Sequence, residues 1–214
     1  GVVKFAGDAT ADAEVDGDDV VTYADLLRLS IDLDNNRTPK QTKLITGTRL
    51  IDTRTIAGAR ALYIGSELQP TLEAMTDLHG NPAFVPVHQY AAGATIMNGE
   101  IGSVGYFRVI VVPEMMHWAG AGADATGVET SYETGGAFDV FPMLCVGEGS
   151  FTTIGFQTDG KTVKFKITHK APGIETADRA DPYGETGFMS IKWYYGFLLQ
   201  RPERIGLIKT SGQL

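Results

Sequence analysis

The sequence is poor in cysteine, since Cys145 is the only one among its 214 residues. A single cysteine cannot form a disulfide within the chain, which excludes the small disulfide-stapled folds and makes the cytoplasm the simplest compartment for folding. Cys145 lies in the apolar run Phe-Pro-Met-Leu-Cys-Val. We therefore expect it to fill core space and not to react.

Long hydrophobic runs and an excess of basic residues are also missing. No apolar stretch approaches the roughly 18 residues that a membrane helix needs, and the first residues do not follow the basic-then-apolar plan of a secretory signal. The net charge is −8 and the sequence pI is about 5.0. This balance argues against binding nucleic acid through a general basic field, and we expect no membrane partner.

Catalytic motifs are equally scarce. The sequence has no G-x-S-x-G elbow, no Walker loop and no C-x-x-C pair, and its four histidines are too dispersed to share a metal. His117, beside Trp118, is the one histidine that invites a catalytic hypothesis, but the sequence supplies no fixed partner for it. We therefore expect no catalytic residues, no cofactor and no enzymatic activity, with an unfamiliar site near His117 as the enzymatic alternative.

What the sequence does have is a distinctive stretch from Asn98 to Glu114. Asn98-Gly99 is a tight-turn signal, and the β-branched residues that follow, closed by Pro113, predict a buried strand at 109–112. Glycines at 99, 102 and 105 do not have the order of a dinucleotide loop, so no phosphate site is expected.

The acidic residues gather near the start. Asp12, Glu14 and Asp16, followed by Gly17, match the first half of a calcium loop, but its twelfth position is Tyr23 instead of a carboxylate. A solvated acidic loop is the commoner structure for such a segment. The calcium site remains as an alternative, which would make the chain a calcium-dependent binding module of dockerin-like or lectin-like type.

Secondary-structure signals indicate a mixture of helices and strands. Thr22 and Asp25 resemble a capping box at the start of a helix over 22–36, and a second, short helix is expected from Pro70 to about Leu78. Strands are predicted at 59–66, 138–146 and 204–209, with a hairpin at 154–169 that has one core face and one wet face. The segment 187–199 is apolar on both faces, which predicts a strand at the centre of a sheet or under a helix.

Taken in order, these pieces resemble the major capsid proteins of tailed bacteriophages, particularly a podovirus branch. The resemblance covers most of residues 20–210. It rests on the helix 22–36, Ala61-Leu62-Tyr63-Ile64, Asp77-Leu78-His79-Gly80-Asn81, the stretch 98–114, Asp181-Pro182-Tyr183-Gly184, Lys192-Trp193-Tyr194-Tyr195-Gly196 and Arg201-Pro202-Glu203-Arg204-Ile205.

The resemblance implies an α+β chain with the Hong Kong 97-type capsid fold. Residues 1–21 would be an acidic lead-in that forms the last piece of an extended loop. The rest of that loop and the N-terminal arm would lie outside this sequence. Residues 22–57 would be a peripheral domain with the spine helix, 58–165 an axial domain, and 166–214 the return to the peripheral domain.

The resemblance also implies a function. The chain would be a capsid subunit that assembles with copies of itself, in the host bacterial cytoplasm, into hexameric and pentameric capsomers of an icosahedral shell. This virion shell would enclose double-stranded DNA without gripping it tightly. Scaffolding, portal and decoration proteins are further implied partners. Candidate contact regions are the basic segment with Lys43, Arg49 and Arg54 and the glycine-rich loop 118–137 with Trp118.

Overall fold

A computed structural model of the chain describes residues 1–45, 53–90, 96–125, 131–154, 156–158, 161–163, 165–174, 177, 179–193 and 196–213. It divides into two compact units. Unit 1 comprises Gly1–Ser150 and Arg201–Leu214, and unit 2, which we call the ribbon, is Phe151–Gln200. These boundaries do not coincide with the predicted limits of 58–165 and 166–214, whose assignment to axial and peripheral domains stays a prediction.

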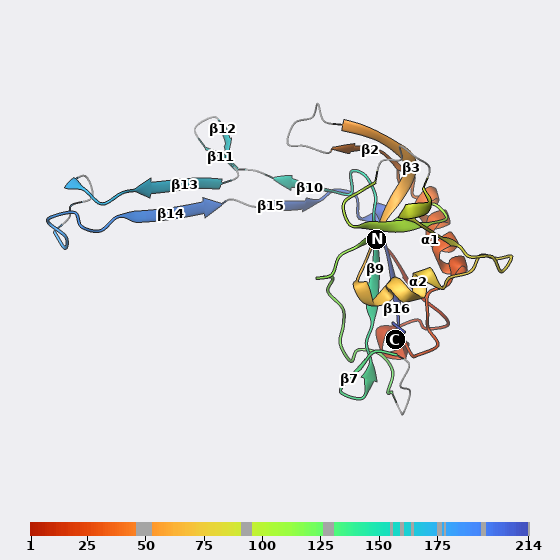
Figure 1. The fold of residues 1–214 in the computed structure, drawn as a ribbon. Coiled ribbons are helices and arrows are strands. Elements are labelled where there is room, and N and C mark those ends of the chain that lie inside the picture. Colours follow the sequence, from red (N-terminus) through yellow and green to blue (C-terminus); the bar gives the residue numbers. More distant parts are fainter. Residues whose placement is uncertain are drawn as a thin grey trace. The chain divides into compact units, whose positions relative to one another are not determined.

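Unit 1 is built on a mixed sheet in the order β1-β16-β9-β3-β6-β5-β4, with β2 paired to β3 (Figure 1). The pairs β1–β16 and β3–β6 are parallel, and the other neighbours are antiparallel. Its strands are β1 (Val2–Phe5), β2 (Gln41–Ile45), β3 (Thr53–Ile64), β4 (Phe84–Pro86), β5 (Glu100–Val104), β6 (Phe107–Val111), β9 (Phe141–Val146) and β16 (Ile205–Thr210). A separate small hairpin pairs β7 (Glu133–Thr134) with β8 (Ala137–Phe138).

The α-helices are α1 (Tyr23–Asn35) and the short α2 (Gln69–Glu73). The predicted capping box of α1 is confirmed, because the Asp25 amide donates to Thr22 Oγ1 and Asp25 Oδ2 accepts from the Thr22 amide. Helix α2 has Pro70 in its first turn but ends well before Leu78. Short 3-10 turns lie at Asp12–Glu14, Ser66–Leu68, Val87–Gln89 and Pro202–Arg204.

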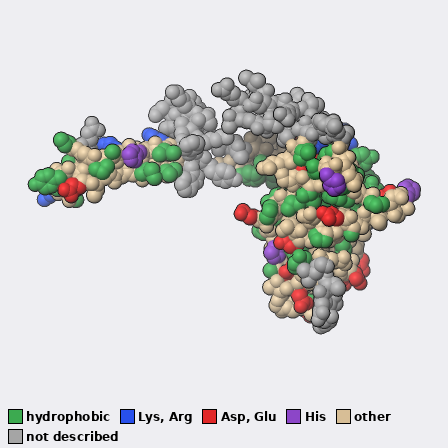
Figure 2. Space-filling view, viewed as in Figure 1, with side chains coloured by type: hydrophobic (Ala, Val, Ile, Leu, Met, Phe, Trp, Pro, Cys, Tyr) green, Lys and Arg blue, Asp and Glu red, His purple; other side chains and the backbone are tan. Residues whose placement is uncertain are grey.

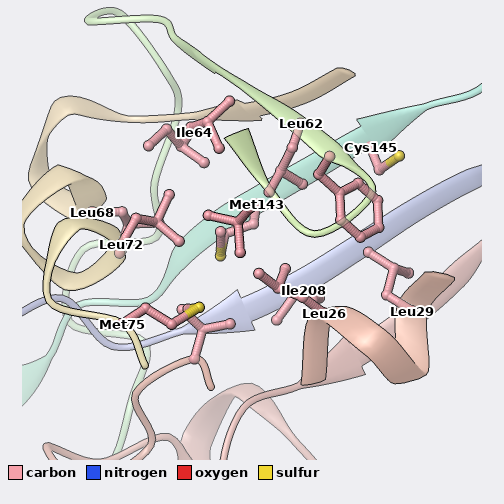
Figure 3. Packing of buried hydrophobic residues seen from close by; sticks show 14 of the residues in the cluster. Leu26, Leu29, Leu62, Ile64, Leu68, Leu72, Met75, Met143, Cys145 and Ile208 are labelled. Carbon is pink, nitrogen blue, oxygen red and sulfur yellow. The ribbon is translucent and has the colours of Figure 1, made fainter. Parts of the chain in front are cut away.

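The main core lies where the two helices meet the sheet. Alternation along β3 points Leu62 and Ile64 to this side, and Ala61 to a smaller cluster with Met97 on the other. Figure 3 shows the main cluster, in which residues from α1, from α2 and the residues that flank it, and from the sheet pack together: Leu26, Leu29, Leu68, Leu72, Met75, Met143, Cys145 and Ile208. Burial raises the pKa of the Cys145 thiol to about 12, so its predicted role as a core residue is confirmed.

Helix α1 lies very close to β16. A Cβ added at Gly206 would come within 2.6 Å of Leu29 Cδ1, so only glycine leaves room for the leucine. Leu29 and Leu33 follow Leu26 at three- and seven-residue spacing, which gives α1 one buried face against the strands.

The predicted turn at Asn98-Gly99 is confirmed, with Gly99 at a φ of 78° and the Glu100 amide donating to the Met97 carbonyl over 3.1 Å. The glycine-spaced residues after it form β5, which pairs with the buried strand β6. Strands β5 and β6 thus form a hairpin in the sheet.

Candidate interaction site

The ribbon consists of strands that pair two by two. Strand β10 (Phe151–Ile154) pairs with β15 (Gly196–Leu199), β11 (Phe156–Thr158) with β12 (Lys161–Val163), and β13 (Phe165–Lys170) with β14 (Phe188–Trp193), all antiparallel. Aromatic and β-branched residues favour these strands. The predicted turn at Asp159-Gly160, between β11 and β12, falls outside the described residues.

Apolar side chains are concentrated on this unit. Although the ribbon holds 50 of the 214 residues, it carries ten of the 17 large hydrophobic side chains that are exposed in the described part of the chain. Figure 2 shows hydrophobic side chains along the ribbon strands. The ten residues are Phe151, Ile167, Ile174, Tyr183, Phe188, Met189, Ile191, Phe197, Leu198 and Leu199. A concentration of exposed apolar side chains is typical of surfaces that contact other proteins.

Two sequence expectations are corrected here. The segment 187–199 is not a central strand: in the described residues it forms two strands, each with one partner, and Met189 is 67% exposed. Strand β13 pairs with β14 and not with β11, and Ile167, expected on a core face, is 57% exposed. The apolar side chains that the pattern placed on a covered strand are thus exposed in the described residues of the ribbon.

The two faces of the β13–β14 pair differ in chemistry. On one face Ile167 lies opposite Ile191 and His169 opposite Met189. The other face, which we call the basic face, carries Lys166 opposite Lys192, Thr168 opposite Ser190 and Lys170 opposite Phe188. All three lysines are exposed.

Between β13 and β14, hydrogen bonds link the described residues around Asp181. Its carboxylate accepts hydrogen bonds from the Glu185 and Thr186 amides and from the Thr186 hydroxyl, while the Gly173 amide donates to the Gly184 carbonyl. Gly184 has a φ of 64°, and a Cβ there would collide with the Gly173 backbone. These bonds fix the segment that presents Ile174 and Tyr183, which are 91% and 84% exposed.

We expect this segment to loosen at acid pH. Hydrogen bonds from the Thr186 hydroxyl and the Thr186 and Glu185 amides lower the pKa of Asp181. The ionised Asp181 carboxylate therefore stabilises the segment fully above the pKa of about 3.9 that it has in the unfolded chain. This stabilisation is lost as the pH falls through the lower pKa of the folded chain. In an NMR titration the Thr186 amide should shift with a midpoint below about 3.9. Asp181→Asn should remove this transition, and a midpoint at or above that value would contradict the assignment.

The predicted contact residues belong to unit 1 and not to the ribbon. Lys43 lies on β2 and Arg54 on β3, and Arg49 falls outside the described residues. The Trp118 ring is half-buried in unit 1, with the Lys209 ammonium 4.3 Å from its centroid. Their role in subunit contact stays a prediction.

The acidic residues considered for calcium are held by contacts within the chain. Both carboxylate oxygens of Asp12 accept from Lys209 Nζ, at 2.6 and 2.7 Å, and Glu14 accepts from the amide and hydroxyl of Thr10. Asp16 Oδ1 accepts the amide two residues on, as in an Asx turn. Within the described ranges no three His, Cys, Asp or Glu side chains form a group suited to a metal ion. This arrangement gives the calcium alternative no support.

His117 is exposed and stacks on Phe141, with ring centroids 5.1 Å apart. The histidine considered as a catalytic candidate therefore packs against an aromatic ring.

Of the helices that the structure describes, none combines the length and apolar composition required to cross a membrane.

The fold has a known counterpart among phage capsids. No protein-family model matches the chain. Its structure is similar to the capsid of Ralstonia phage GP4, with a TM-score of 0.59 over 98% of this chain and 52% of that one, at 10% sequence identity. The chain therefore has a mixed α and β fold that is shared with a phage capsid protein.

The sequence itself is 60% identical over its whole length to the major capsid protein of Pseudomonas phage KPP21. The predicted resemblance to phage major capsid proteins is confirmed. The chain spans about half the length of each protein that it matches, 54% of the KPP21 protein and 52% of the GP4 capsid chain.

Proposed function

We propose that the protein containing this chain is a phage major capsid subunit, which forms hexameric and pentameric capsomers of an icosahedral shell around double-stranded DNA. The observation that carries the proposal is the 60% identity to a major capsid protein, averaged over an alignment that covers the whole chain. The role is structural and places the protein in the virion. Scaffolding, portal and decoration proteins are its further proposed partners.

The ribbon gives this function a physical basis. Covering the ten exposed apolar side chains of the ribbon contributes on the order of 10 kcal/mol at about 25 cal/mol per Å². Association itself costs about 4 to 15 kcal/mol in lost freedom. One ribbon contact is thus marginal, and a closed assembly in which every copy makes several contacts is stable. This balance suits a shell, because misplaced subunits can leave during growth.

We further propose that the fold is of the Hong Kong 97 type. In this assignment α1 belongs to the spine helix of a peripheral domain, residues 58–165 to an axial domain, and 166–214 to the returning part of the peripheral domain. The GP4 likeness supports a capsid fold, and a map of the assembled shell would test the domain assignment.

The experiment that tests the function is assembly of the natural full-length protein. After expression in bacteria, sedimentation and electron microscopy should reveal capsomers or closed shells. Material that stays monomeric at every concentration, with and without the other structural proteins of its phage, would contradict the proposal.

A further inference from the structure

The basic face of the ribbon has a charge pattern that its own folding does not explain. Lys166 and Lys192 lie directly opposite each other, and Lys170 lies on the same face four residues from Lys166. Like charges directly opposite each other destabilise an antiparallel pair. Neither β13 nor β14 contains an acidic residue that could relieve this repulsion.

These lysines have no anionic partner in the described part of the chain. The ion pairs there use Lys4, Arg28, Arg60, Arg108 and Lys209, and none uses a lysine of the basic face. A surface that keeps three ammonium groups together at some cost in stability is suited to an anionic partner outside the ribbon.

The same chain supplies a surface of opposite sign. The ribbon has six of the 18 Lys and Arg residues and five of the 26 Asp and Glu residues, a net charge of +1. Unit 1 therefore has 12 basic and 21 acidic residues, a net charge of −9. Figure 2 shows acidic side chains distributed over the visible face of unit 1.

We infer that the basic face of β13–β14 docks on the acidic surface of unit 1 in a second copy of the chain. The inference rests on the proposed capsid function and names the surfaces that meet. Because a contact surface on the ribbon differs from one on unit 1, the interface is heterologous, and each copy both gives and receives a ribbon, as ring formation requires. A nucleic acid is the weaker candidate, because the net charge of −9 on unit 1 repels phosphates.

Lys166→Glu is the sharpest test, because it separates docking from folding. The substitution places a carboxylate opposite Lys192, so the ribbon itself gains an attractive cross-strand pair. Docking on an acidic partner should nevertheless weaken, and we expect the full-length protein to assemble at least tenfold more slowly, or to need a tenfold higher concentration, in light-scattering and sedimentation assays. Lys170→Glu, which faces Phe188 and creates no new pair, should act in the same direction.

Arg201→Glu is the matched control, since it makes the same change of charge at an exposed residue of unit 1. We expect it to leave assembly within about twofold of the unaltered protein. Assembly of the unaltered protein should also slow when NaCl rises from about 0.05 to 0.3 M, because the Debye length shortens, and Lys166→Glu should reduce this salt dependence.

Several results would overturn the inference while leaving the capsid function intact. The first is normal assembly of both lysine variants, and the second is a loss of assembly with Arg201→Glu that equals theirs. The third is an effect of the lysine variants that does not depend on protein concentration, which would indicate a contact within one chain. Normal assembly with loss of DNA binding in a mobility-shift assay would assign the basic face to nucleic acid instead. Failure of the unaltered protein to assemble would instead contradict the capsid function itself.

Discussion

Replacing the ribbon, residues 151–200, with an Asn-Gly turn is expected to abolish assembly and leave unit 1 folded. The two ends of the ribbon are already joined, because the Arg201 amide donates to the Ser150 carbonyl over 2.9 Å, and a two-residue turn can close such a hairpin. Among the described residues, the main core cluster contains none from the ribbon, so its packing should survive the deletion. Circular dichroism and thermal unfolding would report on unit 1, and sedimentation with electron microscopy on assembly.

A matched control removes apolar surface from unit 1 instead. Ile31 and Leu78 are 59% and 68% exposed, similar to the ribbon residues, and Ile31→Ser with Leu78→Ser should leave assembly intact. Shells formed by the protein without its ribbon would show that the interface lies elsewhere.

Removing the Arg60 side chain is expected to produce the largest loss of stability in unit 1. This guanidinium on β3 is only 1% exposed and bonds Asp34 Oδ1 at 2.6 Å, the Thr38 carbonyl at 2.8 Å and Ser30 Oγ at 3.3 Å. It therefore ties the end of α1 to the middle of the sheet. Arg60→Ala leaves a buried carbonyl without its donor and opens a cavity, which should cost about 3 kcal/mol of unfolding free energy.

Urea denaturation of the full chain, below the concentration at which it assembles, would measure this loss. Arg28→Ala is the control: its side chain is 68% exposed, and its partner Asp25 keeps the hydrogen bonds from the Thr22 amide and hydroxyl, so the loss should cost less than about 1 kcal/mol. Equal effects of the two substitutions would contradict a special role for Arg60. The proposed assembly surface on the ribbon does not involve either arginine.

The local elements of unit 1 could be predicted because their signals are local. Thr22 and Asp25 are three residues apart, and the Asn98-Gly99 turn needs only its own backbone preferences, so both appear in the structure as predicted. The sequence did not reveal that β3, after pairing with β2 along its first residues, lies between β6 and β9. Long-range strand pairing depends on which surfaces fit together, and a single sequence does not contain that information in a local pattern.

The ribbon was the part misjudged. Apolar residues on both faces of a strand predict that both faces are buried. For 187–199 we expected other strands or a helix of the same chain to bury them. The side chains of Met189 and Ile191 are exposed in the described chain. This is the arrangement expected when a second molecule buries them. The absence of charge on one face of β13–β14, and the lysines on the other, became visible only once the strand partners were known, and they are the basis of the proposed interface.

The single cysteine has a practical consequence for studying the shell. Cys145 is sealed in the core and its thiol stays protonated at neutral pH, so thiol reagents find no native target in the folded chain. A dye or crosslinker attached through Tyr183→Cys would then mark one known position within these 214 residues. Distances between such labels could follow the association of copies of the chain in real time.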